Sequence, residues 1–168
     1  GLMRDFYIHI PNGYNREKPV PLVIVFHGGL GLATRMDALT GMDAVSDRNG
    51  FLLVYPEAVN KHWHDGRNID GHDHYNDVQF MLDLIAHLER RWNIDPHRVY
   101  VCGMSNGGFF SQYLALTISE KIAACASVGA TLPQIVASTR RPVQPVSMLY
   151  ILGMADPLMP FAGGNVHY

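Results

Sequence analysis

The sequence predicts an α/β protein with a mostly parallel sheet and helices on both faces. Apolar runs of strand length alternate with longer segments whose apolar residues recur at helical spacing. The runs at 21–26 and 51–56 are continuous rather than alternating, which is typical of strands buried on both faces. Polar, glycine-rich motifs directly follow several of the expected strands. This order of elements favours one doubly covered sheet.

Length and composition restrict the possibilities further. The chain has 168 residues, so we expect one domain over residues 1–168. Hydrophobic residues make up 48% and charged residues 17%, which is typical of a globular protein. The net charge is −2 and no block of like charges occurs, so neither nucleic acid nor a membrane surface is expected as a partner.

The N-terminal half is expected to contain three strands and one helix. The strands are expected at residues 5–11, 21–26 and 51–56. The helix lies between the second and third strands. Thr34 can cap its first turn, and Gly50 is expected to end it.

The C-terminal half continues the alternation. Residues 57–75 form a polar loop, and Asn76 with Gln79 resembles a capping box that opens a helix to about Trp92. Asp95-Pro96 is expected to break the chain before the next strand. The remaining expected elements are strands at 99–103, 122–128 and 147–152, a helix after residue 105, and a loop or short helix within 131–146.

A Gly-x-Ser-x-Gly pattern over residues 103–107 joins one strand to the following helix. This is the layout of a nucleophile elbow, which presents a serine, here Ser105, on a tight turn. His27-Gly28-Gly29 and Asp156 follow two other strands directly. Ligands bind beyond the carboxyl ends of parallel strands, so we expect these three motifs to converge at one edge of the sheet.

Six sequence blocks occur in order along nearly the whole chain. They are PLVIVFHGG, GFLLVYPEA, a tryptophan soon after (Trp63), YNDVQF, NIDPHRVYVCGMSNGG and LGMADPLMPFAGG. With these blocks the chain resembles the poly(3-hydroxybutyrate) depolymerase and feruloyl esterase branch of the α/β-hydrolases. The resemblance implies the α/β-hydrolase fold and a secreted or extracytoplasmic enzyme, although no signal-peptide pattern begins at Gly1.

The resemblance also implies a function and its residues. Ser105 would be the nucleophile, and Asp156 would orient the general base. The oxyanion donors would be the backbone N–H of Asn106 and that of Gly29 or Leu30. The implied activity is that of a serine carboxylesterase, acting through an acyl-enzyme on esters of hydroxyalkanoates or aromatic acids. An acyltransferase or thioesterase on the same scaffold is the alternative enzyme.

The polar loop allows more than one interpretation. The run from His62 to Asp65, with His72-Asp73-His74, has the residue types of a zinc site, but the spacing fits no standard site, so we expect no metal and no cofactor. Trp63 is expected either to form a wall of the substrate pocket or simply to pack. His27 is expected to order its loop beside the pocket.

Two further expectations concern Cys102 with Cys125 and the end of the chain. Free buried thiols are expected, with a disulfide as the alternative.

In the family that the chain resembles, the triad histidine follows the acid by several tens of residues, after one more helix and strand. Residues 1–168 are therefore expected to lack the base and the last helix and strand.

The strand ending at Leu152 would then be a sheet edge. A C-terminal fragment that carries the histidine, or a second chain, is expected to dock there. His167 is the candidate base within the chain. If no base is supplied, the alternative is a catalytically incomplete fragment that acts only as a binding module.

Overall fold

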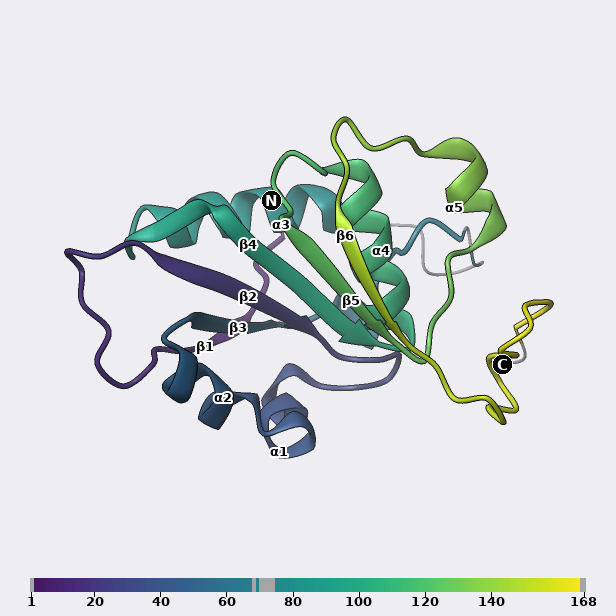
Figure 1. Ribbon diagram of the computed structural model, residues 1–168, viewed down its shortest axis with the longest axis horizontal. Coiled ribbons are helices and arrows are strands. Elements are labelled where there is room, and N and C mark those ends of the chain that lie inside the picture. Colours follow the sequence, from purple (N-terminus) through teal and green to yellow (C-terminus); the bar gives the residue numbers. More distant parts are fainter. Residues whose placement is uncertain (1, 68, 70–74, 167–168) are drawn as a thin grey trace.

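The computed structural model describes residues 2–67, 69 and 75–166. Within these residues, six strands form one sheet in the order β1-β3-β2-β4-β5-β6 (Figure 1). They are β1 (Phe6–His9), β2 (Val20–Phe26), β3 (Leu52–Pro56), β4 (Ile94–Met104), β5 (Ala124–Val128) and β6 (Ser147–Ile151). Strand β1 pairs antiparallel with β3, and every other pairing is parallel. The predicted mostly parallel sheet is confirmed.

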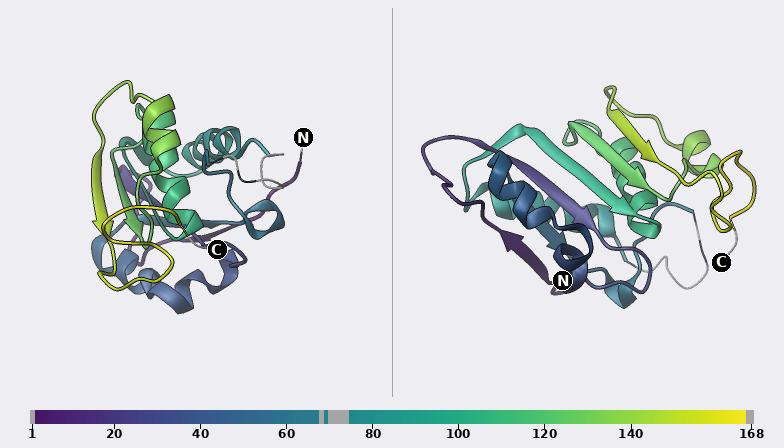
Figure 2. Two further views of the ribbon diagram at one scale, coloured as in Figure 1. Left: turned by 90° about the vertical axis from the view of Figure 1, so that its right-hand side faces the viewer. Right: turned by 60° about the horizontal axis from the view of Figure 1, so that its bottom comes forward.

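Helices cover both faces of the sheet, as the two rotated views show (Figure 2). One face carries α3 (Asp77–Glu89), α4 (Asn106–Thr117) and α5 (Gln134–Thr139), and the other carries α1 (Met36–Thr40) and α2 (Met42–Asn49). Two short 3₁₀ turns, η1 (Ala33–Arg35) and η2 (Val59–Lys61), lie in the loops after β2 and β3.

The single helix expected between Thr34 and Gly50 is wrong. Thr34 lies inside η1, and α1 begins without a side-chain cap. Gly41, with a φ of 62°, then separates α1 from α2, because a left-handed residue cannot continue a right-handed helix. Gly50, with a φ of 71°, ends α2 as predicted.

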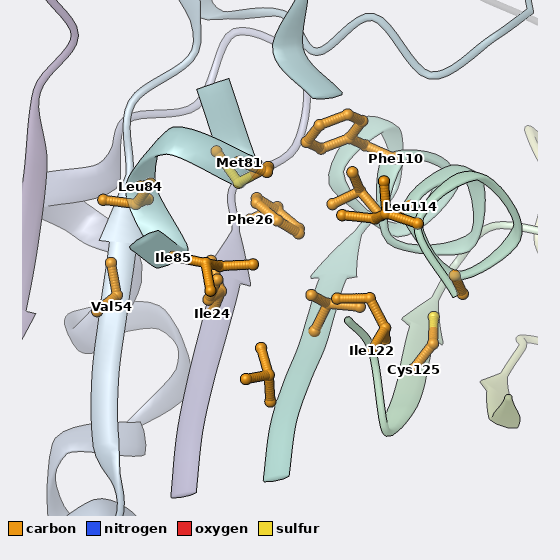
Figure 3. Close-up of a cluster of buried hydrophobic side chains, with 14 of the residues drawn as sticks. Ile24, Phe26, Val54, Met81, Leu84, Ile85, Phe110, Leu114, Ile122 and Cys125 are labelled. Atoms are coloured by element: carbon orange, nitrogen blue, oxygen red, sulfur yellow. The ribbon is translucent and has the colours of Figure 1, made fainter. Parts of the chain in front are cut away.

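Strands β2 and β3 are buried on both faces, so successive side chains enter two different clusters. Ile24 and Phe26 enter the main core under α3 and α4 (Figure 3), whereas Val25 faces the smaller cluster under α1. The main core also receives Met81, Leu84 and Ile85 from α3, and Phe110 and Leu114 from α4. Each such side chain contributes about 1.5–3 kcal/mol on burial, which fixes the sheet that carries the polar loops.

Two boundaries differ from the expectation. Helix α3 begins as predicted, because the Asn76 side chain accepts the Gln79 N–H at 3.0 Å, but it ends at Glu89 rather than near Trp92. Asp95-Pro96 does not precede the strand but lies inside β4. The pairing with β2 jumps there from Ile94 to Val99, so the irregular stretch is accommodated as a bulge.

Strand β6 is the outermost strand on its side of the described sheet. Leu149 is 57% exposed and Ile151 is 53% exposed, whereas β3 is buried along its whole length. Among the described residues, no helix has the length and apolar character needed to cross a membrane.

Candidate active site

Ser105 lies at the sharp turn between β4 and α4. Its φ of 53° and ψ of −122° are unfavourable for a residue with a side chain, and its N–H donates to the carbonyl oxygen of Val128 at 2.9 Å. The side chain is exposed at the carboxyl edge of the sheet. The chain therefore forms the elbow geometry, with a serine hydroxyl presented to solvent above the start of a helix.

Two glycines allow this turn to pack tightly. A Cβ on Gly107 would lie 2.5 Å from the carbonyl oxygens of both Phe26 and His27, and a Cβ on Gly103 would lie 2.4 Å from the carbonyl oxygen of Gly107. No side chain fits at either position. The elbow thus packs directly against the main chain at the end of β2.

The loop after β2 lies beside the elbow. A Cβ on Gly28 would lie 3.5 Å from the Cβ of Ser105, and a Cβ on Gly29 would lie 3.8 Å from the Cβ of Asn106. Asn106 begins α4, so its N–H is one of the helix-terminal donors without an intrahelical acceptor. Within the described residues, the N–H of Gly29 donates to no backbone carbonyl oxygen.

Leu30 differs from Gly29 in this respect. Its N–H donates to the carbonyl oxygen of Lys61 at 2.8 Å, so this donor is already engaged. Of these two N–H groups, only that of Leu30 donates to a backbone carbonyl oxygen of the described residues. Which of them would donate to an oxyanion stays a prediction.

His27 is 1% exposed and lies beneath the loop. Its Nδ1 lies 2.7 Å from the carbonyl oxygen of Gly28, and its Nε2 accepts the Ala58 N–H at 3.1 Å. Glu57 Oε1 lies 3.0 Å from the same Nε2. The contacts with Gly28 and Ala58 fix the ring between the ends of β2 and β3, where it orders the loop.

Trp63 lies in the core rather than at an open wall. It is 1% exposed and stacks on Phe110 with an interplanar angle of 4° and a centroid separation of 5.0 Å. Its indole N–H donates to the carbonyl oxygen of His27 at 3.1 Å. The interpretation of Trp63 as a pocket wall is at odds with this burial, and the packing alternative fits.

Asp156 follows β6 on a turn. Its Oδ1 accepts the N–H groups of Leu158 at 2.9 Å and Met159 at 3.0 Å, and the residue is half-buried. Met159 is buried against Phe109 of α4, which holds the turn beside the elbow. Ser105 and Asp156 line the same cavity, of about 590 Å³, and we call it the acid-side cavity.

A second cavity, of about 640 Å³, lies along the loop after β2, and we call it the loop-side cavity. Its lining includes Leu30, Met36, Leu39, Met104 and the exposed Arg35. Met104, the residue before the serine, lines both cavities. The elbow therefore has a cavity on each side.

The histidine-rich loop holds no cluster of three potential metal ligands within the part of the chain that the structure describes. His72, Asp73 and His74 lie outside the described residues, as does His167. Cys102 and Cys125 are free thiols; Cys125 is buried and Cys102 half-buried.

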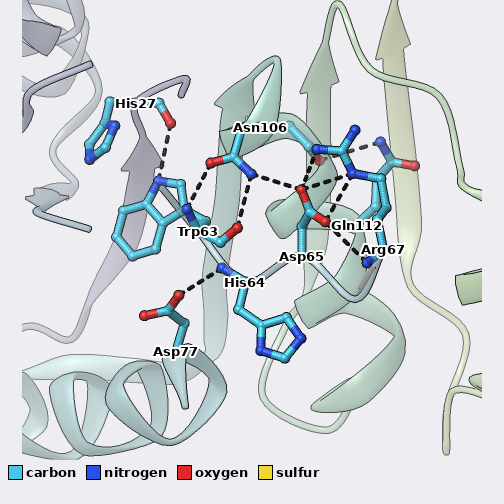
Figure 4. Close-up of polar contacts among 9 residues, drawn as sticks. His27, Trp63, His64, Asp65, Arg67, Asp77, Asn106 and Gln112 are labelled. Atoms are coloured by element: carbon cyan, nitrogen blue, oxygen red, sulfur yellow. Dashed lines mark hydrogen bonds and ion pairs between the residues drawn. The ribbon is translucent and has the colours of Figure 1, made fainter. Parts of the chain in front are cut away.

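The sequence did not indicate the hydrogen-bond network beside the elbow. Asp65, expected in a polar surface loop, is 3% exposed, and Arg67 contacts it at 2.7 Å (Figure 4). The Asn106 side chain joins this pair through its Nδ2, which donates to Asp65 at 2.7 Å. Opposite charges on either side of Gly66, which has a φ of 81°, are the sequence signal that could have suggested a compact turn.

The chain is similar to known esterases. Residues 4–143 match the family model described as Esterase PHB depolymerase. The protein named "Putative esterase NocK", from Nocardia uniformis subsp. tsuyamanensis, is 36% identical over 97% of this chain and 48% of its own length. Feruloyl esterase B of Piromyces equi is 25% identical over 96% of this chain and 31% of its own length.

A solved structure, described as that of a thermostable esterase, superposes with a TM-score of 0.72 at 17% identity. The superposed part covers 94% of this chain and 44% of the esterase. This likeness shows that the chain has the α/β-hydrolase fold. The chain thus spans about half the length, or less, of these relatives. With the family match extending from β1 through the elbow and beyond α5, the chain belongs to the Esterase PHB depolymerase family of α/β-hydrolases.

Proposed function

We propose that residues 1–168 form part of one catalytic domain of a serine carboxylesterase and that Ser105 is its nucleophile. The observation that carries the proposal is the exposed, strained Ser105, which lies beside two N–H donors and shares a cavity with Asp156. Family membership supports ester bonds as the substrate class. Action outside the cytoplasm belongs to the same proposal and is based on the family resemblance.

The proposed reaction proceeds in two steps. Ser105 Oγ attacks the ester carbonyl carbon while its proton passes to a general base, and the base then gives that proton to the departing alkoxide. The carbonyl oxygen becomes an oxyanion, which the N–H groups of Asn106 and Gly29 receive. Water next attacks the acyl carbon while the same base accepts its proton. The bond between the acyl carbon and Ser105 Oγ then breaks, Oγ takes the proton back from the base, and the carboxylic acid leaves.

The two cavities suggest where the two halves of the ester bind. The base must contact both Ser105 and Asp156, so the alkoxide that it protonates leaves through the acid-side cavity. The acyl group then enters the loop-side cavity, whose lining is largely apolar. This assignment fits hydroxyalkanoate or aromatic acyl groups.

The base is proposed to be a histidine from polypeptide docked on β6, either a C-terminal fragment or a second chain. The exposed apolar side chains of β6 and the greater length of the relatives support this proposal. An edge strand with exposed apolar residues pairs readily with other chains.

Native mass spectrometry with light scattering tests the docking on residues 1–168 prepared alone. We expect association, which Leu149→Lys reduces because it places a charge on the edge. A monodisperse monomer with full esterase activity would contradict the docking proposal, and His167 would then be the first base to test.

The esterase activity itself is tested with p-nitrophenyl esters on the full-length protein, by which we mean residues 1–168 together with the polypeptide proposed to supply the base. We expect hydrolysis of hydroxyalkanoyl or cinnamoyl esters, with loss of at least about 10³-fold in Ser105→Ala. Products formed with added alcohols or thiols distinguish an acyltransferase or thioesterase. A folded wild type without turnover on any ester would reject the enzyme and favour a binding module.

A further inference from the structure

Positive φ angles at residues with side chains are concentrated around the elbow. In the described part of the chain they occur at Leu30 (62°), Asn60 (51°), Lys61 (58°) and Ser105 (53°). Such a conformation costs about 1–3 kcal/mol and persists only where surrounding contacts impose it. The four residues lie on three segments, and these segments contact one another beside the elbow.

The segment that begins at Asn60 lies between the other two. Its residues 61–65 make the contacts, and we call them the bridge segment. On one side it contacts the elbow through the Asn106 side chain (Figure 4). Asn106 Oδ1 accepts the Trp63 N–H at 2.8 Å, and Asn106 Nδ2 donates to the Trp63 carbonyl oxygen at 3.0 Å. The side-chain amide thus pairs with the main chain at two points, as a neighbouring strand would.

On its other side the bridge segment contacts the loop after β2. The Lys61 carbonyl oxygen accepts the Leu30 N–H at 2.8 Å, and the Trp63 indole N–H donates to the carbonyl oxygen of His27 at 3.1 Å. The His62 ring also lies close to Gly29, because a Cβ placed there would be 3.2 Å from its Nδ1. The same five residues therefore contact both loops that carry the oxyanion donors.

We propose that the bridge segment sets the distance between the two oxyanion donors, the N–H groups of Gly29 and Asn106. The Asn106 side chain and the Asp65 carboxylate act as positioning residues. This inference rests on the proposed esterase function, because only that function uses both donors together.

Asp65 gives the arrangement its rigidity. Its Oδ2 accepts the Asn106 Nδ2 at 2.7 Å, and Arg67 donates to the same carboxylate from Nε at 2.9 Å and from Nη2 at 2.7 Å. Asp65 and Asn106 are each 3% exposed, and the Arg67 guanidinium lies 3.7 Å from the Phe109 ring centroid. Hydrogen bonds to a buried carboxylate are short and strong, so they hold the Asn106 amide in one orientation.

A small displacement of either donor matters chemically. A misplacement of about 1 Å in a catalytic site costs up to about 100-fold in rate, and loss of one oxyanion donor costs about 10²–10³-fold. The ground-state ester binds mainly through its acyl and alkoxy groups, so its affinity is affected far less. A fault in the bridge segment should therefore lower kcat with little change in KM.

The experiment compares Asp65→Asn with Asp95→Asn in the full-length protein. Asp95 is a matched control, since it also pairs with a nearby arginine, Arg98, three residues further on. Its side chain is 25% exposed, and it lies at the start of β4, at the opposite end of the strand from the elbow. We expect Asp65→Asn to lower kcat for a p-nitrophenyl ester by about 10–100-fold, with KM within about twofold. Binding of an arylboronic acid, whose tetrahedral serine adduct places an oxygen between the donors, should weaken by a similar factor. Asp95→Asn should change neither.

Circular dichroism establishes that the variants fold. If Asp65→Asn does not fold, Arg67→Gln is tested instead. This variant keeps the hydrogen bond from Asn106 to Asp65 but removes the arginine that holds the Asp65 carboxylate. We therefore expect a smaller loss of kcat than in Asp65→Asn. A folded variant with wild-type kcat and boronate affinity, or with only a raised KM, would overturn the positioning role. A folded wild type without hydrolysis and without boronate binding would instead reject the proposed function itself, and this inference with it.

Discussion

The two sides of the proposed site are built very differently. On the nucleophile side, Gly103 and Gly107 have backbone contacts that leave no room for a Cβ, and the Asn106 side chain is buried in three hydrogen bonds. On the acid side, Asp156 sits on a turn with two local hydrogen bonds. Its neighbour Met154 is 85% exposed.

This difference shows which side of the site is held in place by contacts within the described chain. The elbow lies at the end of central strands, where neighbours on every side restrict it. The acid turn follows edge strand β6 and is held to α4 mainly by Met159. We infer that the nucleophile side is preorganised, whereas the acid side reaches its working geometry only with the polypeptide that we propose to dock on β6.

The largest expected effect comes from a change on the acid side. Asp156→Asn keeps the shape of the side chain but removes the charge that would orient the base and stabilise it when protonated. We expect kcat/KM of the full-length protein to fall by about 10³–10⁴-fold, while the free energy of unfolding changes by less than about 1 kcal/mol. A fall of less than tenfold in kcat/KM would remove Asp156 from the triad.

The free energy of unfolding should be more sensitive to changes on the nucleophile side than on the acid side. Gly107→Ala places a Cβ 2.5 Å from two carbonyl oxygens, so we expect a loss of about 3 kcal/mol or more in urea unfolding. Gly153→Ala is the matched control on the acid side, because its Cβ meets nothing closer than 3.5 Å. Equal losses in the two variants would show that the two sides are packed alike.

The smallest effect concerns the two thiols on the central strands β4 and β5. Burial raises the pKa of the Cys102 thiol on β4 to about 11 and that of the Cys125 thiol on β5 to about 12. The unfolded thiol ionises near pH 8.5, so the folded state holds its proton longer as the pH rises. The stability from these protonated thiols is thus complete below about pH 8.5 and is lost above it.

Between pH 8.5 and pH 10 we expect Cys125 alone to account for a loss of about 1–2 kcal/mol in unfolding free energy. Urea unfolding at several pH values measures this slope, and Cys125→Ala should flatten it. An unchanged slope in that variant would show that Cys125 does not stay protonated as its burial implies.

The sequence predicted the strands and the elbow because these depend on local patterns. The continuous apolar runs of β2 and β3, and the glycines around Ser105, leave little choice of structure. The split at Gly41 was missed because an apolar periodicity can continue across a left-handed residue. Asp95-Pro96 was misplaced because a bulge can absorb a proline within a paired strand.

The site was predictable only where a motif marks it. The resemblance indicated Ser105, Asp156 and Asn106, and the structure places Ser105 and Asp156 on one cavity. It did not indicate the burial of Asp65 or the Asn106 side-chain contacts, because both depend on a loop folding back onto the elbow from 41 residues away. Polar loop residues look alike in sequence, whether they face water or each other.

One measurement tests the central claim most directly, namely that Ser105 is the preorganised nucleophile of an esterase. The folded protein is treated with a fluorophosphonate, and its intact mass and peptide map are recorded beside those of Ser105→Ala. We predict a single label, located on Ser105 and absent from the variant. A label that persists in Ser105→Ala, or a folded wild type that takes no label at excess reagent, would contradict the account.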